Sequence, residues 1–95
     1  MNDSNSKQTN GKRLERFFKG PANHRRIDLI LFAEKNENTS LEGLSDGLKT
    51  DYKTIAVHVE KLVQAGLLNK QYQGRAVLHK LSPYGKRFAK FIKTF

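Results

Sequence analysis

The chain has 95 residues and a mass of 10.9 kDa, which is enough for one small folded domain and excludes a second. It contains no cysteine, and this excludes disulfides and thiolate metal sites. The longest purely apolar run, residues 29–33, is far shorter than the roughly 18 residues that a membrane span requires. The polar first residues do not have the pattern of a signal peptide. We therefore expect a cytoplasmic protein that does not enter a membrane.

The net charge of +9 is unevenly distributed along the chain. Residues 1–60 contain ten basic and nine acidic residues, whereas residues 61–95 contain eight basic and no acidic residues. A segment with charges of one sign repels itself, so this pattern predicts an anionic partner such as nucleic acid. The alternative is a solvated basic face that only keeps the protein soluble.

The first part of the chain changes character at Lys12. Before it the residues are polar and show no apolar periodicity, which predicts a disordered tail over residues 1–11 and a folded domain over residues 12–95. A short helix is expected from Lys12 to the Gly20-Pro21 pair, which stops it. A second helix over about residues 23–35 has apolar residues on more than one face and is expected to be largely buried.

The next segment has the pattern of a helix-turn-helix. Thr39, with Glu42 three residues later, matches a capping box and predicts the start of a short third helix over residues 40–48. Asp51 is expected to cap a fourth, amphipathic helix over residues 52–65. Two helices joined by three or four residues, the second longer than the first, form a helix-turn-helix.

A hairpin and a last helix are expected to complete the domain. Residues 67–73 and 75–81 have the composition of two strands joined by a turn at Gly74. Ser82 is expected to cap the last helix, with Pro83 at its first position. The apolar residues of this helix form one stripe: Tyr84, Phe88, Phe91, Ile92 and Phe95.

Several of these segments resemble one family of proteins. The stretch from Leu44 to Ile55, LSDGLKTDYKTI, is similar to winged helix-turn-helix repressors of the ArsR and MarR type, as are His58, Leu62 and residues 65–68. The start of the fourth helix, DYKT, resembles archaeal ArsR-like members, and LSPYG at residues 81–85 resembles the end of their wing. Lys49 stands where these proteins usually have a turn glycine.

The resemblance covers roughly residues 23–87 and has consequences for fold and function. It implies a mainly α fold with a small β-hairpin, in the order α-α-α-α-β-β-α. It also implies a transcriptional regulator, expected to be a repressor, that binds double-stranded DNA in a sequence-specific manner. A winged-helix module that binds protein or RNA is the alternative, because fold alone does not decide function. The apolar pair Ala56-Val57 favours this alternative, and the basic end of the chain opposes it.

The candidate DNA-binding residues follow from the geometry of a helix-turn-helix, whose second helix places its N-terminal residues at base edges in the major groove. Hydroxyl and ammonium groups there can reach phosphates or a guanine, and small apolar side chains can contact a thymine methyl. The resemblance further implies that Arg75, after the turn glycine, meets the DNA backbone or minor groove. The full set is Tyr52, Lys53, Thr54, Ala56, Val57, His58, Lys61, Lys70, Arg75, Arg25 and Arg26.

Some of these residues have alternative roles that the sequence leaves open. Plain solvation is the alternative for Lys53 and Arg75, and contact with a partner protein is the alternative for Val57. Arg25 and Arg26 are either phosphate contacts or only the polar first turn of the second helix.

Metal binding and catalysis find little support in the sequence. His24, His58 and His79 have no second ligand at a spacing of three or four residues along a helix, so we expect no metal site. There is no glycine-rich phosphate loop and no nucleophile elbow. We therefore expect no cofactor and no enzymatic activity.

Both ends of the folded part have apolar stripes that a domain of this size does not easily cover. The resemblance implies a homodimer built from the terminal helices. The alternative is that both helices fold back on their own core. The expected interface residues are Leu14, Phe17, Phe18, Tyr84, Phe88, Phe91, Ile92 and Phe95.

Overall fold

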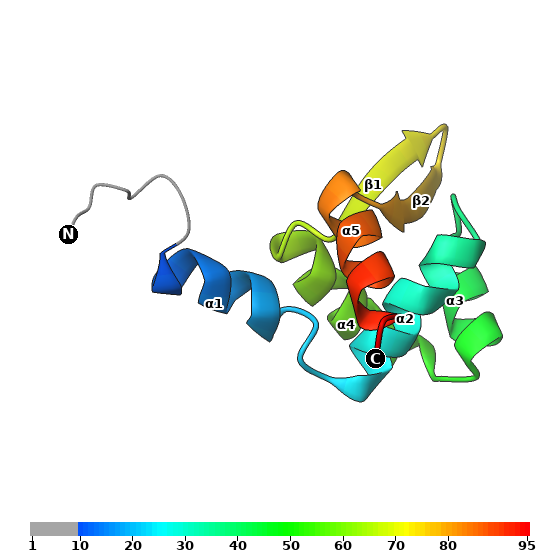
Figure 1. The fold of residues 1–95 in the computed structure, drawn as a ribbon. Coiled ribbons are helices and arrows are strands. Elements are labelled where there is room, and N and C mark those ends of the chain that lie inside the picture. The colour runs from blue at the N-terminus through cyan, green and yellow to red at the C-terminus, as the bar shows by residue number, and fades with distance from the viewer. Residues whose placement is uncertain (1–9) are drawn as a thin grey trace.

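The computed structural model describes residues 10–95, apart from the side chains of residues 16 and 17. Within this range, helices and a hairpin follow one another in the expected order α-α-α-α-β-β-α (Figure 1). The elements are α1 (Gly11–Lys19), α2 (His24–Lys35), α3 (Leu41–Leu48), α4 (Tyr52–Gln64), β1 (Leu68–Gln73), β2 (Ala76–Leu81) and α5 (Pro83–Ile92). The prediction of a mainly helical fold with one small hairpin is confirmed. Most of the predicted tail lies outside the described residues, and α1 begins at Gly11, inside the expected tail.

The core forms around α2, which packs against α3, α4, α5 and β2. Leu29, Ile30 and Ala33 of this helix are buried, and the other apolar residues of α2 are half-buried, as expected from a helix with apolar residues on several faces. The remaining buried apolar residues come from every later element: Leu44, Ile55, Val59, Leu62, Leu67, Leu68, Leu81 and Ala89.

Three of the predicted helix starts are confirmed by their capping bonds. The Asn23 side chain accepts a hydrogen bond from the Arg25 amide, Asp51 accepts one from the Thr54 amide, and Ser82 Oγ accepts one from the Gly85 amide. Each bond satisfies a backbone N–H that has no partner inside the helix.

The predicted capping box at Thr39 is wrong. Ser40 caps α3, because its Oγ accepts a hydrogen bond of 3.1 Å from the Gly43 amide. Thr39 instead pairs with His79 in an isolated antiparallel bridge, in which each backbone N–H donates to the other residue's carbonyl. The sheet contact fixes the Thr39 backbone and moves the cap one residue along the chain.

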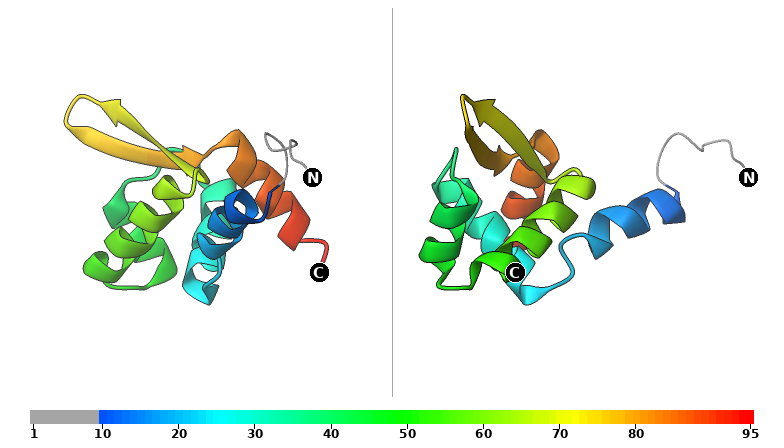
Figure 2. Two further views of the ribbon diagram at one scale, coloured as in Figure 1. Left: turned by 90° about the vertical axis from the view of Figure 1, so that its left-hand side faces the viewer. Right: turned by 180° about the vertical axis from the view of Figure 1, so that it is seen from behind.

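The hairpin is antiparallel, with a register that runs from Leu68 opposite Leu81 to Gln73 opposite Ala76. Both strands begin one residue later than expected. Gly74 has a φ of +60°, a backbone conformation in the left-handed region that glycine adopts without steric cost. The hairpin projects beyond the helical body, on the side of α3 and α4 and away from α1 and α5 (left panel of Figure 2).

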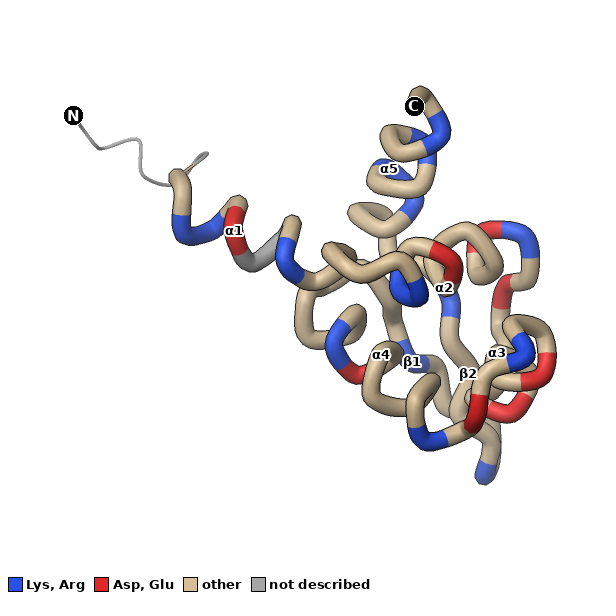
Figure 3. Tube along the Cα trace, turned by 90° about the horizontal axis from the view of Figure 1, so that it is seen from below, with Lys and Arg blue, Asp and Glu red and all other residues tan. Residues whose placement is uncertain are grey.

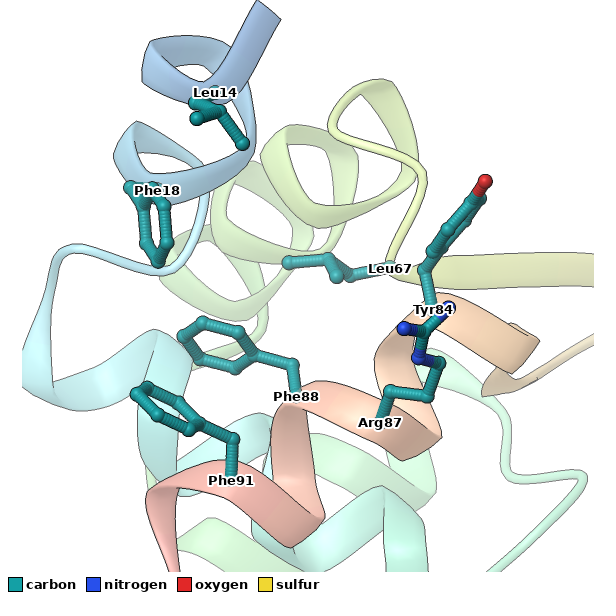
Figure 4. Close-up of a pocket in the computed structure, with 7 residues that line it drawn as sticks. All are labelled: Leu14, Phe18, Leu67, Tyr84, Arg87, Phe88 and Phe91. Carbon is teal, nitrogen blue, oxygen red and sulfur yellow. The ribbon is translucent and has the colours of Figure 1, made fainter. Parts of the chain in front are cut away.

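Gly85 allows α5 to pack closely against the base of the hairpin. A Cβ atom at this position would lie 2.1 Å from the backbone oxygen of Leu67, a distance that no side chain tolerates. The first turn of α5 therefore lies directly on the chain that enters β1, and Ala89 one turn later is fully buried. This contact leaves the aromatic side of α5 turned towards α1 (Figure 4).

Candidate nucleic-acid interface

The start of α4 is fixed by a pair of hydrogen bonds between Asp51 and Thr54. The Thr54 amide donates to one carboxylate oxygen of Asp51 at 3.1 Å, and the Thr54 hydroxyl donates to the other at 2.7 Å. These bonds, the hydroxyl bond foremost, lower the pKa of Asp51 below its ordinary value. The Thr54 hydroxyl is thus engaged in the cap, and it reaches a phosphate as a donor only by giving up this bond.

The predicted outward face of α4 is exposed. The side chains of Tyr52 and Val57 are 51% and 56% exposed, and Lys53 and Lys61 are exposed as well. Ala56 is half-buried. The opposite face, with Ile55, Val59 and Leu62, is buried in the core. The helix therefore presents a mixed apolar and basic surface in its first two turns.

Arg25 lies beside the turn between α3 and α4. Its Nη1 donates a hydrogen bond of 2.9 Å to Thr50 Oγ1, and the Ser45 hydroxyl donates to the Thr50 carbonyl on the other side of the turn. Lys49 in this turn has a left-handed backbone, with φ of 53° and ψ of 45°. The start of α2 and the start of α4 thus meet at one exposed turn, and Arg25 remains exposed there.

Arg26 and His58 contact one another and do not lie on the exposed face of α4. Arg26 Nε donates to His58 Nδ1 at 3.0 Å, and Arg26 Nη1 donates to the Gly20 carbonyl at 3.0 Å. Both residues are half-buried. Burial first, and then the charges of Arg26, Arg25 and His24, lower the pKa of His58. The two residues join the α1–α2 connection, α2 and α4.

The hairpin contributes two of the predicted basic residues in different settings. Arg75 is exposed in the turn. Lys70 forms an ion pair with Glu60 of α4, at 3.6 Å between Nζ and Oε1. Tyr72 is 69% exposed on the same face of the hairpin as Lys70. Tyr72 was not among the DNA-binding residues predicted from the sequence, although side chains alternate along a strand and Lys70 and Tyr72 therefore share one face.

Helices α3 and α5 each carry charges of one sign (Figure 3). The charged residues of α5 are all basic. The acidic residues of α3 and of the α2–α3 connection lie together on another part of the surface. Lys93 near the end of α5 is paired with Glu34, with 2.8 Å between Nζ and Oε2. The basic end of the sequence is therefore divided between the hairpin and α5.

The aromatic residues expected at a dimer interface line a hollow between α1 and α5. The rings of Phe18 and Phe88 meet edge to face with centroids 6.4 Å apart. Phe88 and Ile92 also pack against the core of their own chain, and the side chain of Phe17 lies outside the described residues. The hollow has a volume of about 320 Å³ and is lined by Leu14, Phe18, Leu67, Tyr84, Arg87, Phe88 and Phe91 (Figure 4).

A large part of this surface is exposed to solvent. Phe18 is 53% exposed, Phe91 is 50% exposed and Phe95 is 92% exposed. Phe91 and Phe95 contact one another, with ring centroids 5.2 Å apart and perpendicular planes. Exposed apolar clusters are typical of surfaces that bind a protein, a membrane or a ligand.

The three histidines have different surroundings. His79 is buried and its Nδ1 lies 3.0 Å from the Thr39 carbonyl oxygen, His58 contacts Arg26, and His24 is exposed at the start of α2. In the part of the chain that the structure describes, no three histidine, aspartate or glutamate side chains come close enough to hold a metal ion. No helix within residues 10–95 is long and apolar enough to cross a membrane.

A comparison with models of protein families found no match, and neither did a comparison with curated protein sequences. Solved structures match well. HlyU from Vibrio cholerae superposes with a TM-score of 0.79 at 24% identity, over 92% of this chain and 95% of that protein. The homodimeric winged helix-turn-helix DNA-binding domain of Mb0332 from Mycobacterium bovis, a possible ArsR-family regulator, gives a TM-score of 0.83 at 17% identity, over 99% and 87% of the two chains.

A predicted DNA-binding transcriptional regulator from Escherichia coli matches over almost the whole length of both chains, with a TM-score of 0.80 at 13% identity. MarR from Listeria monocytogenes also matches, with a TM-score of 0.68 at 19% identity, over 82% of this chain and 54% of that protein. The fold of this chain is therefore the winged helix-turn-helix fold. Within that fold α4 occupies the position of the second helix of the helix-turn-helix, which we call the recognition helix, and the hairpin occupies the position of the wing.

Proposed function

We propose that the protein is a homodimeric transcriptional repressor that binds double-stranded DNA in a sequence-specific manner. The start of α4 enters the major groove, and Arg75 on the wing contacts the backbone or the adjacent minor groove. The observation that carries the proposal is that the start of the exposed recognition helix and the tip of the wing lie on one side of the body, away from α5 (left panel of Figure 2). Such a protein acts in the cytoplasm, the location expected from the sequence.

The basic residues of this side supply the electrostatic part of the affinity. Each lysine or arginine that neutralises a phosphate releases a counterion, so the logarithm of the binding constant falls by about 0.9 per contact as the logarithm of the salt concentration rises. Arg75 and Arg25 are exposed at the two ends of the proposed interface, one in the wing and one beside the α3–α4 turn.

The proposal is tested by titrating a fluorescent duplex of random sequence with the protein at about 50 to 200 mM salt. We expect a steep salt dependence, and Arg75→Ala should reduce its slope by about 0.9. Lys90→Ala is the matched control, because it removes one charge from α5, on the other side of the body. Binding that ignores salt, or that responds equally to both variants, would contradict the proposal.

A second candidate function is the binding of a protein or of RNA through the same helix. Val57 favours it, because this apolar side chain is 56% exposed in the middle of the proposed interface. The same titration with single-stranded RNA, and with heparin as a competitor, separates the two functions. Tighter binding to RNA than to duplex DNA would favour the second.

A further inference from the structure

Glu60 lies in the third turn of α4, between the two parts of the proposed DNA interface, the start of α4 and the wing. It is the only acidic residue of α4, and its side chain is 52% exposed. It follows Lys53 by seven residues, close to two full turns, so both side chains emerge on the same outward face of the helix. An acidic group there repels the phosphates that the rest of the surface attracts, and the proposed function gives it no role.

The partner of Glu60 is a lysine of the wing. Lys70 Nζ lies 3.6 Å from Glu60 Oε1, and Gln64 Nε2 donates to Glu60 Oε2 at 3.4 Å. Helix α4 packs directly against β1, so this ion pair bridges the recognition helix and the base of the wing. The proposed binding mode places α4 in the major groove and the wing at the adjacent minor groove, so we expect a pair that joins these two elements to lie near the phosphate backbone between the grooves.

A phosphate at this place competes with Glu60 for Lys70. As long as the ion pair persists, Lys70 adds no net charge to the surface and releases no counterion on binding. When a phosphate displaces the carboxylate, Glu60 is left facing the polyanion. Exposed ion pairs of this kind add little to folding stability, so removing the acidic group is expected to change the charge of the surface and not the fold.

We propose that Glu60 masks the charge of Lys70 and so keeps the affinity of this surface for duplex DNA of any sequence below the level that its basic residues would give. This inference rests on the proposed DNA-binding function. It makes Glu60 a residue that limits sequence-independent binding, since contacts to phosphates carry no sequence information. Discrimination between sequences is then left to the first two turns of α4.

The experiment is a double-mutant cycle on a duplex of random sequence, with wild type, Glu60→Gln, Lys70→Gln and the double variant. Glu60→Gln should bind about three- to tenfold tighter at 50 mM salt, with a slope steeper by about 0.9, because Lys70 then neutralises one more phosphate. Lys70→Gln alone leaves Glu60 unpaired and should weaken binding, but with little change in the salt slope, because the paired lysine releases no counterion. In the Glu60→Gln background it should abolish the gain.

Glu15→Gln is the matched control for the loss of a paired, exposed carboxylate. Glu15 forms an ion pair with Lys19 at 3.1 Å, and both residues belong to α1 and to neither α4 nor the wing. This variant should bind random DNA as wild type does. Circular dichroism of each variant establishes that the fold is retained.

Two outcomes would overturn the inference while DNA binding itself stands: Glu60→Gln binds no tighter than wild type, or Lys70→Gln alone lowers the salt slope as much as Arg75→Ala does. Absence of salt-dependent duplex binding by wild type, with no effect of Arg75→Ala, would instead remove the proposed function, and the inference with it.

Discussion

The guanidinium of Arg26 binds two acceptors that belong to different parts of the fold, the Gly20 carbonyl before α2 and the His58 ring on α4. Because His58 accepts at Nδ1, its proton lies on Nε2 in the neutral ring. Protonation of Nδ1 would remove the acceptor and place two positive charges side by side. A neutral His58 is therefore part of the contact that joins the α1–α2 connection to the recognition helix.

This contact predicts a loss of stability at mildly acidic pH. The pKa of His58 is lowered from its ordinary value of 6.5, first by burial and then by the neighbouring cations. The unfolded chain therefore binds a proton at a higher pH than the folded protein does. The contribution of His58 to stability is fully present above pH 6.5 and is lost as the pH falls through and below that value.

His58→Gln tests this prediction, because glutamine offers Arg26 an acceptor that does not titrate. We expect the melting temperature of wild type to fall more between about pH 7.5 and pH 5 than that of the variant. The measurement is thermal unfolding followed by circular dichroism at each pH. An equal fall in the two proteins would show that His58 is not the group responsible.

The first two turns of α4 carry the prediction about sequence discrimination. Lys53 is the exposed cation there, and Val57 offers only an apolar contact. At a selected binding site, Lys53→Ala is expected to cost about 1 to 3 kcal/mol where the lysine reaches a guanine, and less where it holds a phosphate. Val57→Ala should relax the preference at a thymine without changing the salt slope, because a methyl contact carries no charge.

The preferred DNA sequence is obtained by selecting bound fragments from the source genome. Titrations with a duplex of this sequence and with a duplex of random sequence then give the specific and the nonspecific affinity. The free energy difference between them is the quantity to compare among wild type, Lys53→Ala and Val57→Ala. If both variants keep the wild-type difference, α4 does not discriminate between sequences, and binding of a protein partner becomes the better interpretation of its exposed apolar residues.

At the scale of elements, the turn between α3 and α4 contains a residue in an unfavourable conformation. Lys49 has a φ of +53°, and the left-handed region costs a residue with a Cβ roughly 1 to 2 kcal/mol. The Lys49 amide donates to the Asp46 carbonyl at 3.3 Å and so closes the end of α3. The turn keeps its geometry because its backbone bonds, together with the Ser45 hydroxyl on the Thr50 carbonyl, determine it.

Lys49→Gly is expected to stabilise the protein. Glycine adopts this conformation without steric cost, and part of the gain is offset by the greater freedom of the unfolded chain. The net gain should be about 0.5 to 1 kcal/mol in the free energy of unfolding, measured by urea denaturation. Lys49→Ala, which removes the same charge but keeps a Cβ, is the control and should give no such gain.

The elements that the sequence predicted well are those defined by local signals. Asp51, Ser82 and Gly74 have the predicted roles at helix starts and at the hairpin turn, because caps and turns depend on neighbouring residues alone. The cap of α3 was predicted at Thr39, and the structure places it at Ser40. Both residue types cap helices, and the bridge from Thr39 to a residue 40 positions away decides between them.

The candidate site shows the same division between local and distant signals. The outward face of α4 follows from helical periodicity, and the exposure of Lys53 and Val57 agrees with it. The partners of Arg26 and Lys70 come from elements far apart in the sequence. No spacing along the chain indicates such pairs. The sequence identifies Arg26 and Lys70 only as basic residues, and their partners in the structure change the role expected of them.

At the scale of the whole molecule, the fold separates two surfaces. The start of the recognition helix and the tip of the wing lie on one side and α5 lies on the other (left panel of Figure 2), and aromatic side chains of α5 face α1 (Figure 4). A two-fold dimer formed through the second surface would present two copies of the first to DNA. Such a dimer should prefer a pseudo-palindrome with half-sites about one helical turn apart, roughly 34 to 36 Å.

Phe91→Asp is the variant that tests the dimer. Phe91 is half-exposed and lies between Phe88, which packs on the core, and the exposed Phe95. Burying a phenylalanine contributes roughly 1.5 to 3 kcal/mol, so a carboxylate in its place should dissociate the dimer and leave the fold of each chain intact. Wild type should sediment as a species near twice 10.9 kDa, and the variant as a species near 10.9 kDa. The circular dichroism of the variant should show unchanged helicity.

Lys90→Asp is the control, since it places the same carboxylate on the same helix at an exposed position outside the aromatic cluster. It should remain dimeric.

A dimer also has a consequence for DNA binding, because two linked recognition helices bind a pseudo-palindrome more tightly than either does alone. Phe91→Asp should therefore lose affinity for the pseudo-palindromic site and keep the affinity of a single domain for random duplex. Wild type that sediments as a monomer at high micromolar concentration would contradict the prediction and leave the aromatic residues of α1 and α5 to a different partner.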